Sequence, residues 1–278
     1  MALNTIGGII MKKIIFIGAG SIAEALIHGW VEQDVIDAKQ VYVSNRSNQE
    51  RLDELTNKYG VNQLKDYKAL QGADLIILAM KPKDARVAMD AIRPYVEEDT
   101  SVLSVLAGIS MQTIEDHLGN RPIARVMPNT SATIGMSASG IAFNPLVSAV
   151  QRGLYIQMLE AVGIVIEVEE DKLHAVTALS GSGPAYLYYL VEAFERVGTE
   201  FGLSKEIVRK LMVQTIAGSA EMLKSVKEEP EVLRKKVTSP GGTTEAGINA
   251  LEAMAFNEAI ASCIRSAENR SRELAKGE

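Results

Sequence analysis

A glycine-rich turn between an apolar run and a helical segment restricts the fold of this chain most strongly. The sequence IIFIGAGSIAEALIHGW places Gly18, Gly20 and Ala23 in a G-x-G-x-x-A pattern, directly after a β-branched run. The first glycine permits a tight turn, the second lets the backbone approach a pyrophosphate, and the alanine allows close helix–strand packing. The pattern predicts a Rossmann-type dinucleotide site in which Ser21 and Ile22 also take part. An ordinary βα turn is the alternative interpretation.

The rest of the first half supports that interpretation, because short apolar runs alternate with helical periods. The runs are KKIIFIG, VYVSN, DLIILAM, SVLSVLAG, PIARVMP, GIAFN and GIVIEV. Apolar residues on both faces are typical of strands in a covered, largely parallel sheet. After Glu169 only helical periods follow. We predict an α/β Rossmann domain over residues 11–168 and an all-α domain over residues 169–278, with residues 1–10 as an extension before the start-like MKKIIFIGAG.

Charge and apolar run length exclude two classes of partner. A net charge of −6 without a basic cluster argues against nucleic acid. The longest apolar runs are far shorter than the ~20 residues that cross a bilayer. The single cysteine, Cys263, cannot form an internal disulfide, and the three histidines lack metal-ligand spacing. We expect a soluble, cytoplasmic protein that holds no metal and binds small molecules or protein partners.

The end of the second predicted strand favours NADP over NAD. NAD sites usually carry a carboxylate there, which accepts hydrogen bonds from the ribose 2′-hydroxyl, but this chain reads VYVSNRS. Ser44, Asn45 and Arg46 offer donors and a positive charge that suit a 2′-phosphate. We therefore expect NADPH as the cofactor, with NADH possible. A solvated Arg46 is the alternative.

Three more loops follow predicted strands, in LAMKPKD, SVLAG and RVMPNT. Because the carboxyl ends of parallel strands meet at the edge where ligands bind, these loops are expected to line the cofactor cleft. The cofactor residues predicted in them are Ala79, Met80, Lys81, Pro82, Ala107, Gly108 and Asn129.

The helical half is unusually apolar. LMVQTIAGSA and LYYLVEAF offer nonpolar residues on more than one helix face. Such helices usually pack against a partner chain, so we expect a homo-oligomer. Packing against the Rossmann domain of the same chain is the alternative.

Five motifs in a fixed order resemble those of the pyrroline-5-carboxylate reductase family. They are FIGAGSIAEAL, AMKP, RVMPNT, VTALSGSGPAY and SPGGTTEAGINALE, and the resemblance covers nearly the whole chain from Met11. It implies NAD(P)H-dependent reduction of 1-pyrroline-5-carboxylate to L-proline, the last step of proline biosynthesis. It also implies a helical domain that interlocks two chains and builds rings from the dimers. The chain departs from the family pattern at Ser131, where proline is usual, at His174 and at Asp66.

The resemblance gives a role to two glycine-rich segments, SGSGPA and SPGGTT. Glycine and proline weaken a helix interior by roughly 1 and 3 kcal/mol, so their presence in an apolar helical run needs a compensating function. Closely approaching backbone N–H groups suit a substrate carboxylate. The residues predicted to bind substrate are Ser180, Gly181, Ser182, Gly183, Pro184, Ser239, Gly241, Gly242 and Thr243.

By the same resemblance, Thr244 is the candidate catalytic residue. Its hydroxyl would hydrogen-bond the imine nitrogen and orient or relay a proton. Capping of the helix that begins before EAGINALE is the alternative role for the threonines.

Two other functions remain open on the sequence. A β-hydroxyacid dehydrogenase has a similar plan but needs a catalytic lysine on the first long helix of its second domain, and TALSGSGPAYLYYLVEAF contains none. A nonenzymatic dinucleotide-sensing regulator would need neither SGSGPA nor SPGGTT.

Overall fold

The computed structural model describes residues 11–276, which form two compact units. The first unit contains the residues up to Pro184 together with those from Ala267 onwards, and the second is Ala185–Ser266. The unit boundary therefore lies later than the end of the predicted strands at Val168. The reason is that the segment after the last strand packs on the sheet, where Leu173 joins the buried core.

The first unit is built on one eight-stranded sheet in the order β3-β2-β1-β4-β5-β6-β7-β8. Every neighbouring pair is parallel except β6–β7, which confirms the predicted largely parallel sheet. The strands are β1 (Ile14–Ile17), β2 (Val41–Ser44), β3 (Asn62–Gln63), β4 (Leu75–Leu78), β5 (Ser101–Ser104), β6 (Ile123–Met127), β7 (Ser137–Phe143) and β8 (Gly163–Glu167).

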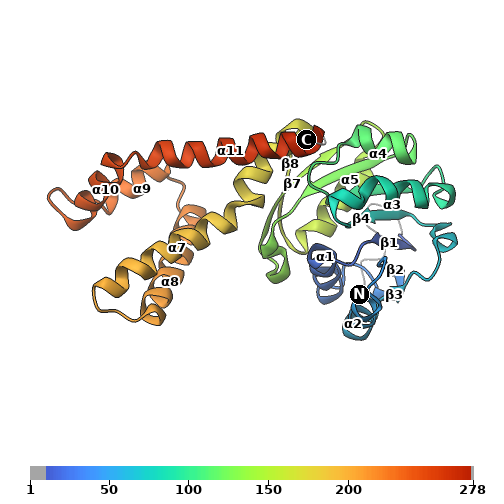
Figure 1. The fold of residues 1–278 in the computed structure, drawn as a ribbon, viewed down its shortest axis with the longest axis horizontal. Helices are drawn as coiled ribbons and strands as arrows, with labels where there is room; N and C mark the ends of the chain where they lie inside the picture. The colour runs from blue at the N-terminus through green and yellow to red at the C-terminus, as the bar shows by residue number, and fades with distance from the viewer. Residues whose placement is uncertain (1–10, 277–278) are drawn as a thin grey trace. The chain divides into compact units, whose positions relative to one another are not determined.

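Helices cover both faces of this sheet (Figure 1). The period-2 alternation of β1 explains the two layers, because Ile14 and Phe16 face one core and Ile15 and Ile17 the other, all at most 3% exposed. Helices α1, α2 and α5 contribute to the first core, and α3, α4 and α6 to the second. Their bounds are α1 (Ser21–Glu32), α2 (Gln49–Tyr59), α3 (Ala85–Ile92), α4 (Met111–Leu118), α5 (Ala149–Glu160) and α6 (Leu173–Val176).

Short helical turns connect these elements. The 3₁₀ turns are η1 (Ala38–Gln40), η2 (Tyr67–Leu70), η3 (Pro82–Asp84), η4 (Arg93–Tyr95), η5 (Thr130–Ile134) and η6 (Glu170–Lys172), and η7 (Thr177–Gly181) is a π-helix.

The second unit is entirely helical, as predicted. Its elements, including the two helices that extend beyond it in sequence, are α7 (Gly183–Glu200), α8 (Lys205–Ser225), α9 (Pro230–Lys236), α10 (Thr243–Ala253) and α11 (Phe256–Lys276). Helices α7 and α8 lie side by side (Figure 1). A Cβ atom at Gly198 would lie 2.5 Å from Val208 Cγ2, so this glycine sets their close approach. The buried Glu195 carboxylate accepts a 2.6 Å hydrogen bond from Arg209 Nε beside that contact.

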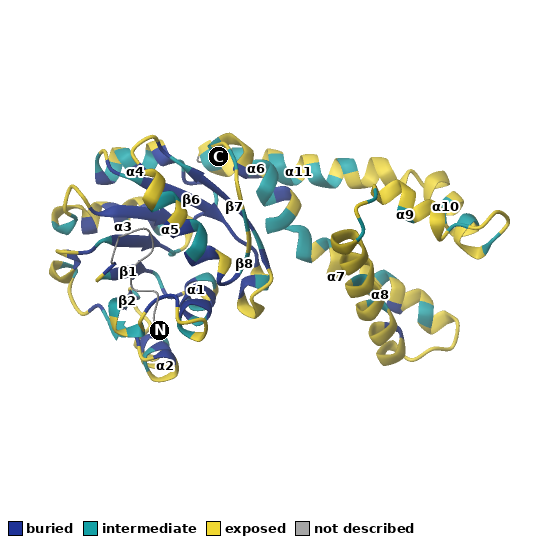
Figure 2. Ribbon diagram, turned by 180° about the vertical axis from the view of Figure 1, so that it is seen from behind, coloured by how far each residue is buried: buried dark blue, intermediate teal, exposed yellow. Residues whose placement is uncertain are grey.

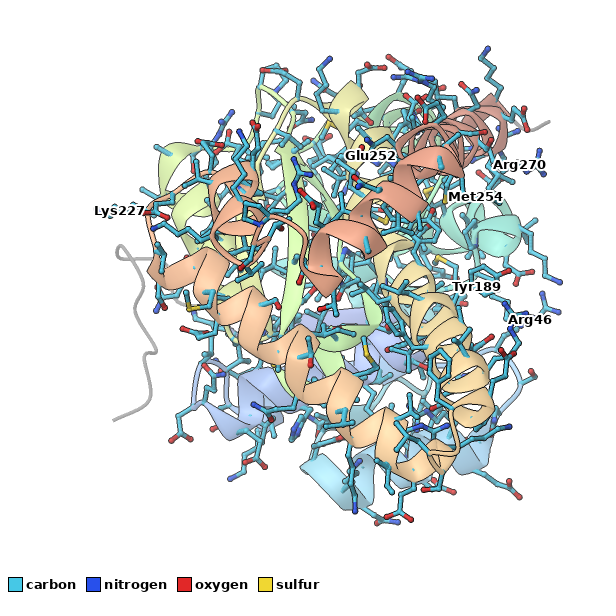
Figure 3. All side chains as sticks on the ribbon, turned by 90° about the vertical axis from the view of Figure 1, so that its left-hand side faces the viewer. Arg46, Tyr189, Lys227, Glu252, Met254 and Arg270 are labelled. Carbon is cyan, nitrogen blue, oxygen red and sulfur yellow. The ribbon has the colours of Figure 1, made fainter. Side chains whose placement is uncertain are left out.

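The helical unit exposes most of its apolar side chains (Figure 2). Within residues 185–266, all of which are described, Val208 is the only buried hydrophobic residue. Tyr189 and Met254, labelled in Figure 3, are 75% and 82% exposed. This unit therefore has almost no core of its own, and its exposed apolar faces are typical of an association surface.

Among the residues described, no helix combines the length and the apolar character that a membrane span requires.

Candidate functional site

A cavity of about 1100 Å³ lies at the carboxyl ends of β1, β2 and β4. The strand order reverses between β1 and β4, and ligands of open α/β sheets bind at that switch point. The cavity brings together most of the residues that the sequence assigned to the cofactor. These are Gly18, Gly20, Ser21, Ile22, Ser44, Asn45, Arg46, Ala79, Met80, Lys81 and Pro82.

The glycine turn has the shape that a pyrophosphate needs. Gly18 has a φ of +113°, and a Cβ atom there would lie 2.5 Å from the carbonyl carbon and oxygen of Ala79. Gly20 is the N-cap of α1 and has no side chain to occupy the first N–H groups of the helix. Ala23 is 1% exposed and packs in the core beneath the turn. The open helix N-terminus and the close backbone approach both fit a bound phosphate group.

An ionic network that no local sequence pattern indicates joins this turn to α2. Arg51 Nε donates a 3.1 Å hydrogen bond to the Ala19 carbonyl oxygen in the glycine turn. The same guanidinium pairs with Glu24, whose carboxylate also accepts 2.9 Å hydrogen bonds from Lys58 and from the Tyr59 hydroxyl. Partial burial raises the pKa of Glu24, but the hydrogen bonds from Lys58, Arg51 and Tyr59 outweigh it and lower that pKa to about 2. Glu24 therefore lines the cavity as an ionised carboxylate whose charge is balanced by Arg51 and Lys58.

The loop after β2 carries the proposed 2′-phosphate contact. The Arg46 side chain, labelled in Figure 3, is 84% exposed, and its Nη1 lies 3.6 Å from Asp84 Oδ1. Asp84 belongs to η3 on another wall of the cavity, next to Lys83. The loop after β2 contains no carboxylate, as the sequence indicated. The fold instead places the Asp84 carboxylate of η3 beside Arg46. Nothing in the local sequence pattern of either loop signals this pairing.

Three predicted cofactor residues, Ala107, Gly108 and Asn129, do not line this cavity. Gly108 has a φ of +73°, and a Cβ atom there would lie 3.2 Å from the backbone of Leu274 in α11. Asn129 is 8% exposed, and its side-chain amide forms hydrogen bonds with the backbone of Ser180 and Ser131, both in the first unit. Their assignment to the cofactor stays a prediction.

The SGSGPA segment interrupts a helix, as the sequence predicted. Residues Thr177–Gly181 form a π-helix, in which Ser182 N donates a 2.8 Å hydrogen bond to the Thr177 carbonyl oxygen. Helix α7 then begins at Gly183 with Pro184 as its second residue. A Cβ atom at Gly183 would meet no atom within 4 Å, so no other described part of this chain packs against this glycine. Single π turns are frequent at functional sites.

The SPGGTT segment lies in the second unit and leads into α10. Gly241 has a φ of +71°, and its N–H donates a 2.8 Å hydrogen bond to Glu245 Oε2. Gly242 is the N-cap of α10 and donates its N–H to the Ser239 carbonyl oxygen at 2.9 Å. The Thr244 side chain is exposed and its hydroxyl has no hydrogen-bond partner among residues 11–276. Thr244 therefore does not cap this helix.

Comparison with protein families gives two matches. Residues 170–274 match the family described as pyrroline-5-carboxylate reductase dimerisation. Residues 13–108 match the family described as NADP oxidoreductase, coenzyme F420-dependent. The first unit therefore carries an NADP-binding domain, and a dimerisation domain follows it along the chain.

Relatives match over nearly the full length. The chain is 46% identical over 266 residues to pyrroline-5-carboxylate reductase 2 of Bacillus subtilis, which covers 95% of each chain. Its structure is similar to that of a pyrroline-5-carboxylate reductase from Coxiella burnetii, with a TM-score of 0.88, 34% identity, and 95% and 99% of the two chains covered. The Plasmodium falciparum pyrroline carboxylate reductase with NADP bound matches with a TM-score of 0.86 and 28% identity over the same shares. The chain therefore belongs to the pyrroline-5-carboxylate reductase family.

Proposed function

We propose that this chain reduces 1-pyrroline-5-carboxylate to L-proline with NADPH, the last step of proline biosynthesis. The observation that carries the proposal is the 46% identity to a Bacillus subtilis reductase over 95% of both chains, which includes the cofactor cavity and both glycine-rich segments. The alternatives fit less well. Helix α7 and the π-helix before it contain no lysine for a β-hydroxyacid dehydrogenase, and a regulator has no need of two glycine-rich segments.

The cavity residues fit a dinucleotide. The N–H groups at the start of α1 face no capping side chain and suit the pyrophosphate, and Gly18 and Gly20 let the backbone approach it. Arg46 and Ser47 suit the 2′-phosphate. When bound, NADPH supplies the hydride. The protein has to hold the imine carbon about 3–3.5 Å from the nicotinamide, since this positioning is the main catalytic task.

The two glycine-rich segments are proposed to hold the substrate. Backbone N–H groups of the non-proline residues within 180–183 and 239–243 suit its carboxylate, and the small side chains leave room for a five-membered ring. The N–H groups of Ser182, Gly241 and Gly242 would exchange their present acceptors for the carboxylate. The Thr244 hydroxyl, which has no partner within the described chain, is free to bond the imine nitrogen. Because a threonine hydroxyl is a weak acid, it orients an already protonated iminium or a water that supplies the proton.

An assay of NADPH oxidation tests the proposed function. We expect NADPH absorbance to fall when 1-pyrroline-5-carboxylate is added, with an equal amount of proline formed. β-Hydroxyacids with NADP should give no turnover. Turnover of β-hydroxyacids alone would identify the dehydrogenase, and NADPH binding without turnover of either substrate would identify a regulator.

Cofactor preference should depend on Arg46. We expect Arg46→Ala to weaken NADPH binding about fivefold and to leave NADH binding nearly unchanged. The size follows from its high exposure, since exposed ion pairs contribute only about 1 kcal/mol. Isothermal titration with both cofactors measures the effect. An equal loss for the two cofactors would show that Arg46 does not contact the 2′-phosphate.

A matched variant uses the carboxylate that pairs with Arg46. Asp84→Asn removes a negative charge that competes with the 2′-phosphate for the same guanidinium. We expect this variant to bind NADPH a few-fold more tightly and NADH as before. In the Arg46→Ala background the gain should be smaller.

Assembly is the second part of the proposal: we infer a homo-oligomer, either a dimer or a ring of dimers. Light scattering at micromolar concentration should give at least twice the chain mass. Leu211→Asp places a charge on an exposed apolar position of α8 and should lower that mass, whereas Lys210→Gln beside it should not. A monomeric wild-type chain would contradict this inference.

A further inference from the structure

Asn129 joins the end of β6 to the π-helix. Its Nδ2 donates a 3.0 Å hydrogen bond to the carbonyl oxygen of Ser180, 51 residues further along the chain. Asn129 is only 8% exposed and Ser180 is partly buried, so the bond is partly shielded from competing water. The end of β6 and the π-helix also approach each other at the next residue, because a Cβ atom at Gly181 would lie 3.7 Å from Met127 Cγ.

The Ser180 carbonyl has a specific need for an outside donor. In an α-helix the carbonyl of one residue accepts a hydrogen bond from the N–H four residues later. For Ser180 that position is Pro184, which has no N–H. Pro184, the second residue of α7, therefore removes the α-helical donor for the Ser180 carbonyl, and the Asn129 amide supplies a donor in its place.

The rest of the Asn129 amide is held in the matching orientation. Its Oδ1 accepts a 3.1 Å hydrogen bond from Ser131 N at the start of η5. Its backbone N–H donates to Ser137 Oγ at 3.1 Å, which fixes the main chain as well. Ser131 gives this donor through its backbone N–H, so the bond does not depend on the serine side chain. With Oδ1 engaged by a donor, Nδ2 faces the carbonyl of Ser180.

We propose that Asn129 is a positioning residue that replaces the missing N–H of Pro184 and so fixes the Ser180–Pro184 segment for substrate. It acts through the backbone of that segment and not by contact with the dinucleotide. The effect on substrate rests on the proposed function, whereas the link between Asn129, Ser180 and Pro184 is independent of it. The sequence pattern predicts a cofactor contact for Asn129, and the two roles give opposite results in the experiment.

A double-mutant cycle on thermal stability tests the link. We expect Asn129→Ala to lower the melting temperature by several degrees, because it leaves the partly buried Ser180 carbonyl without its donor. Pro184→Ala restores an N–H at the position that an α-helix uses, so in that background the loss should be about half as large or less. Ser131→Ala keeps its backbone N–H and should change neither the melting temperature nor the activity. Additive losses from Asn129→Ala and Pro184→Ala would overturn the proposal.

Kinetics of the full-length chain test the consequence for substrate. Asn129→Ala should raise KM for 1-pyrroline-5-carboxylate about tenfold and leave the NADPH Kd within about twofold. If the alanine variant does not fold, Asn129→Asp keeps the acceptor for Ser131 N and loses the donor, and it should show the same KM change. A parallel rise in the NADPH Kd would make Asn129 a cofactor contact and overturn the proposal. If the wild type fails to turn over this imine, the proposed function fails and the stability cycle alone decides the link.

Discussion

Replacing Gly18 with alanine is expected to abolish NADPH binding at concentrations that saturate the wild type. Gly18 has a φ of +113°, which L side chains rarely adopt, and its Cβ would lie 2.5 Å from the Ala79 carbonyl and 2.6 Å from Met80 N. The Ala79 backbone cannot move away freely, because its N–H donates a 2.9 Å hydrogen bond to the carbonyl oxygen of Ile17. Strain and overlap together cost about 2–6 kcal/mol, which is enough to distort the turn or unfold the domain.

Gly20→Ala is the matched control for this prediction. A Cβ atom at Gly20 would lie 3.8 Å from the Ala79 carbonyl oxygen, and the residue needs no positive φ. This variant should keep the melting temperature of the wild type and lose affinity only through the added methyl group beside the pyrophosphate. Fluorescence titration with NADPH and thermal unfolding measure both variants. A Gly18→Ala chain that binds NADPH within threefold of the wild-type Kd would contradict the prediction.

Thr244→Ala should lower kcat/KM for 1-pyrroline-5-carboxylate by about a hundredfold, a usual size for a lost proton-transfer or orienting group. The NADPH Kd should stay unchanged if the hydroxyl acts on the imine nitrogen only. Stability should also stay unchanged, because the N-cap of α10 is Gly242 and the Thr244 hydroxyl bonds no group in the described part of the chain. Thr244→Ser keeps a hydroxyl and should retain most of the activity.

The measurements that check this are steady-state kinetics, NADPH titration and thermal unfolding of the same preparations. Thr243→Ala, one residue earlier, should cost less activity than Thr244→Ala, since its proposed contribution comes from the backbone. A Thr244→Ala enzyme that is fully active but less stable would assign the hydroxyl to helix stability and remove it from the catalytic site.

Local pattern was enough to predict most of the sheet. Strands such as Leu75–Leu78 are apolar on both faces and bounded by turn residues, so the run alone identified a buried strand. β3 was missed because it has two polar residues, Asn62 and Gln63, and becomes a strand only by pairing with β2. The glycine turn was also predictable, since Gly18 and Gly20 are required by backbone shape and follow a recognisable strand.

The sequence by itself determined the order of elements, the dinucleotide turn and the family, because these depend on residues close together in the chain. Only the tertiary structure decided which distant groups meet. Arg51 reaches Glu24, Asp84 reaches Arg46, and Asn129 reaches Ser180, each across a gap that carries no periodic signal. The physical reason is that a hydrogen bond or ion pair needs two groups within a few ångströms, and folding the chain sets that distance where sequence spacing does not.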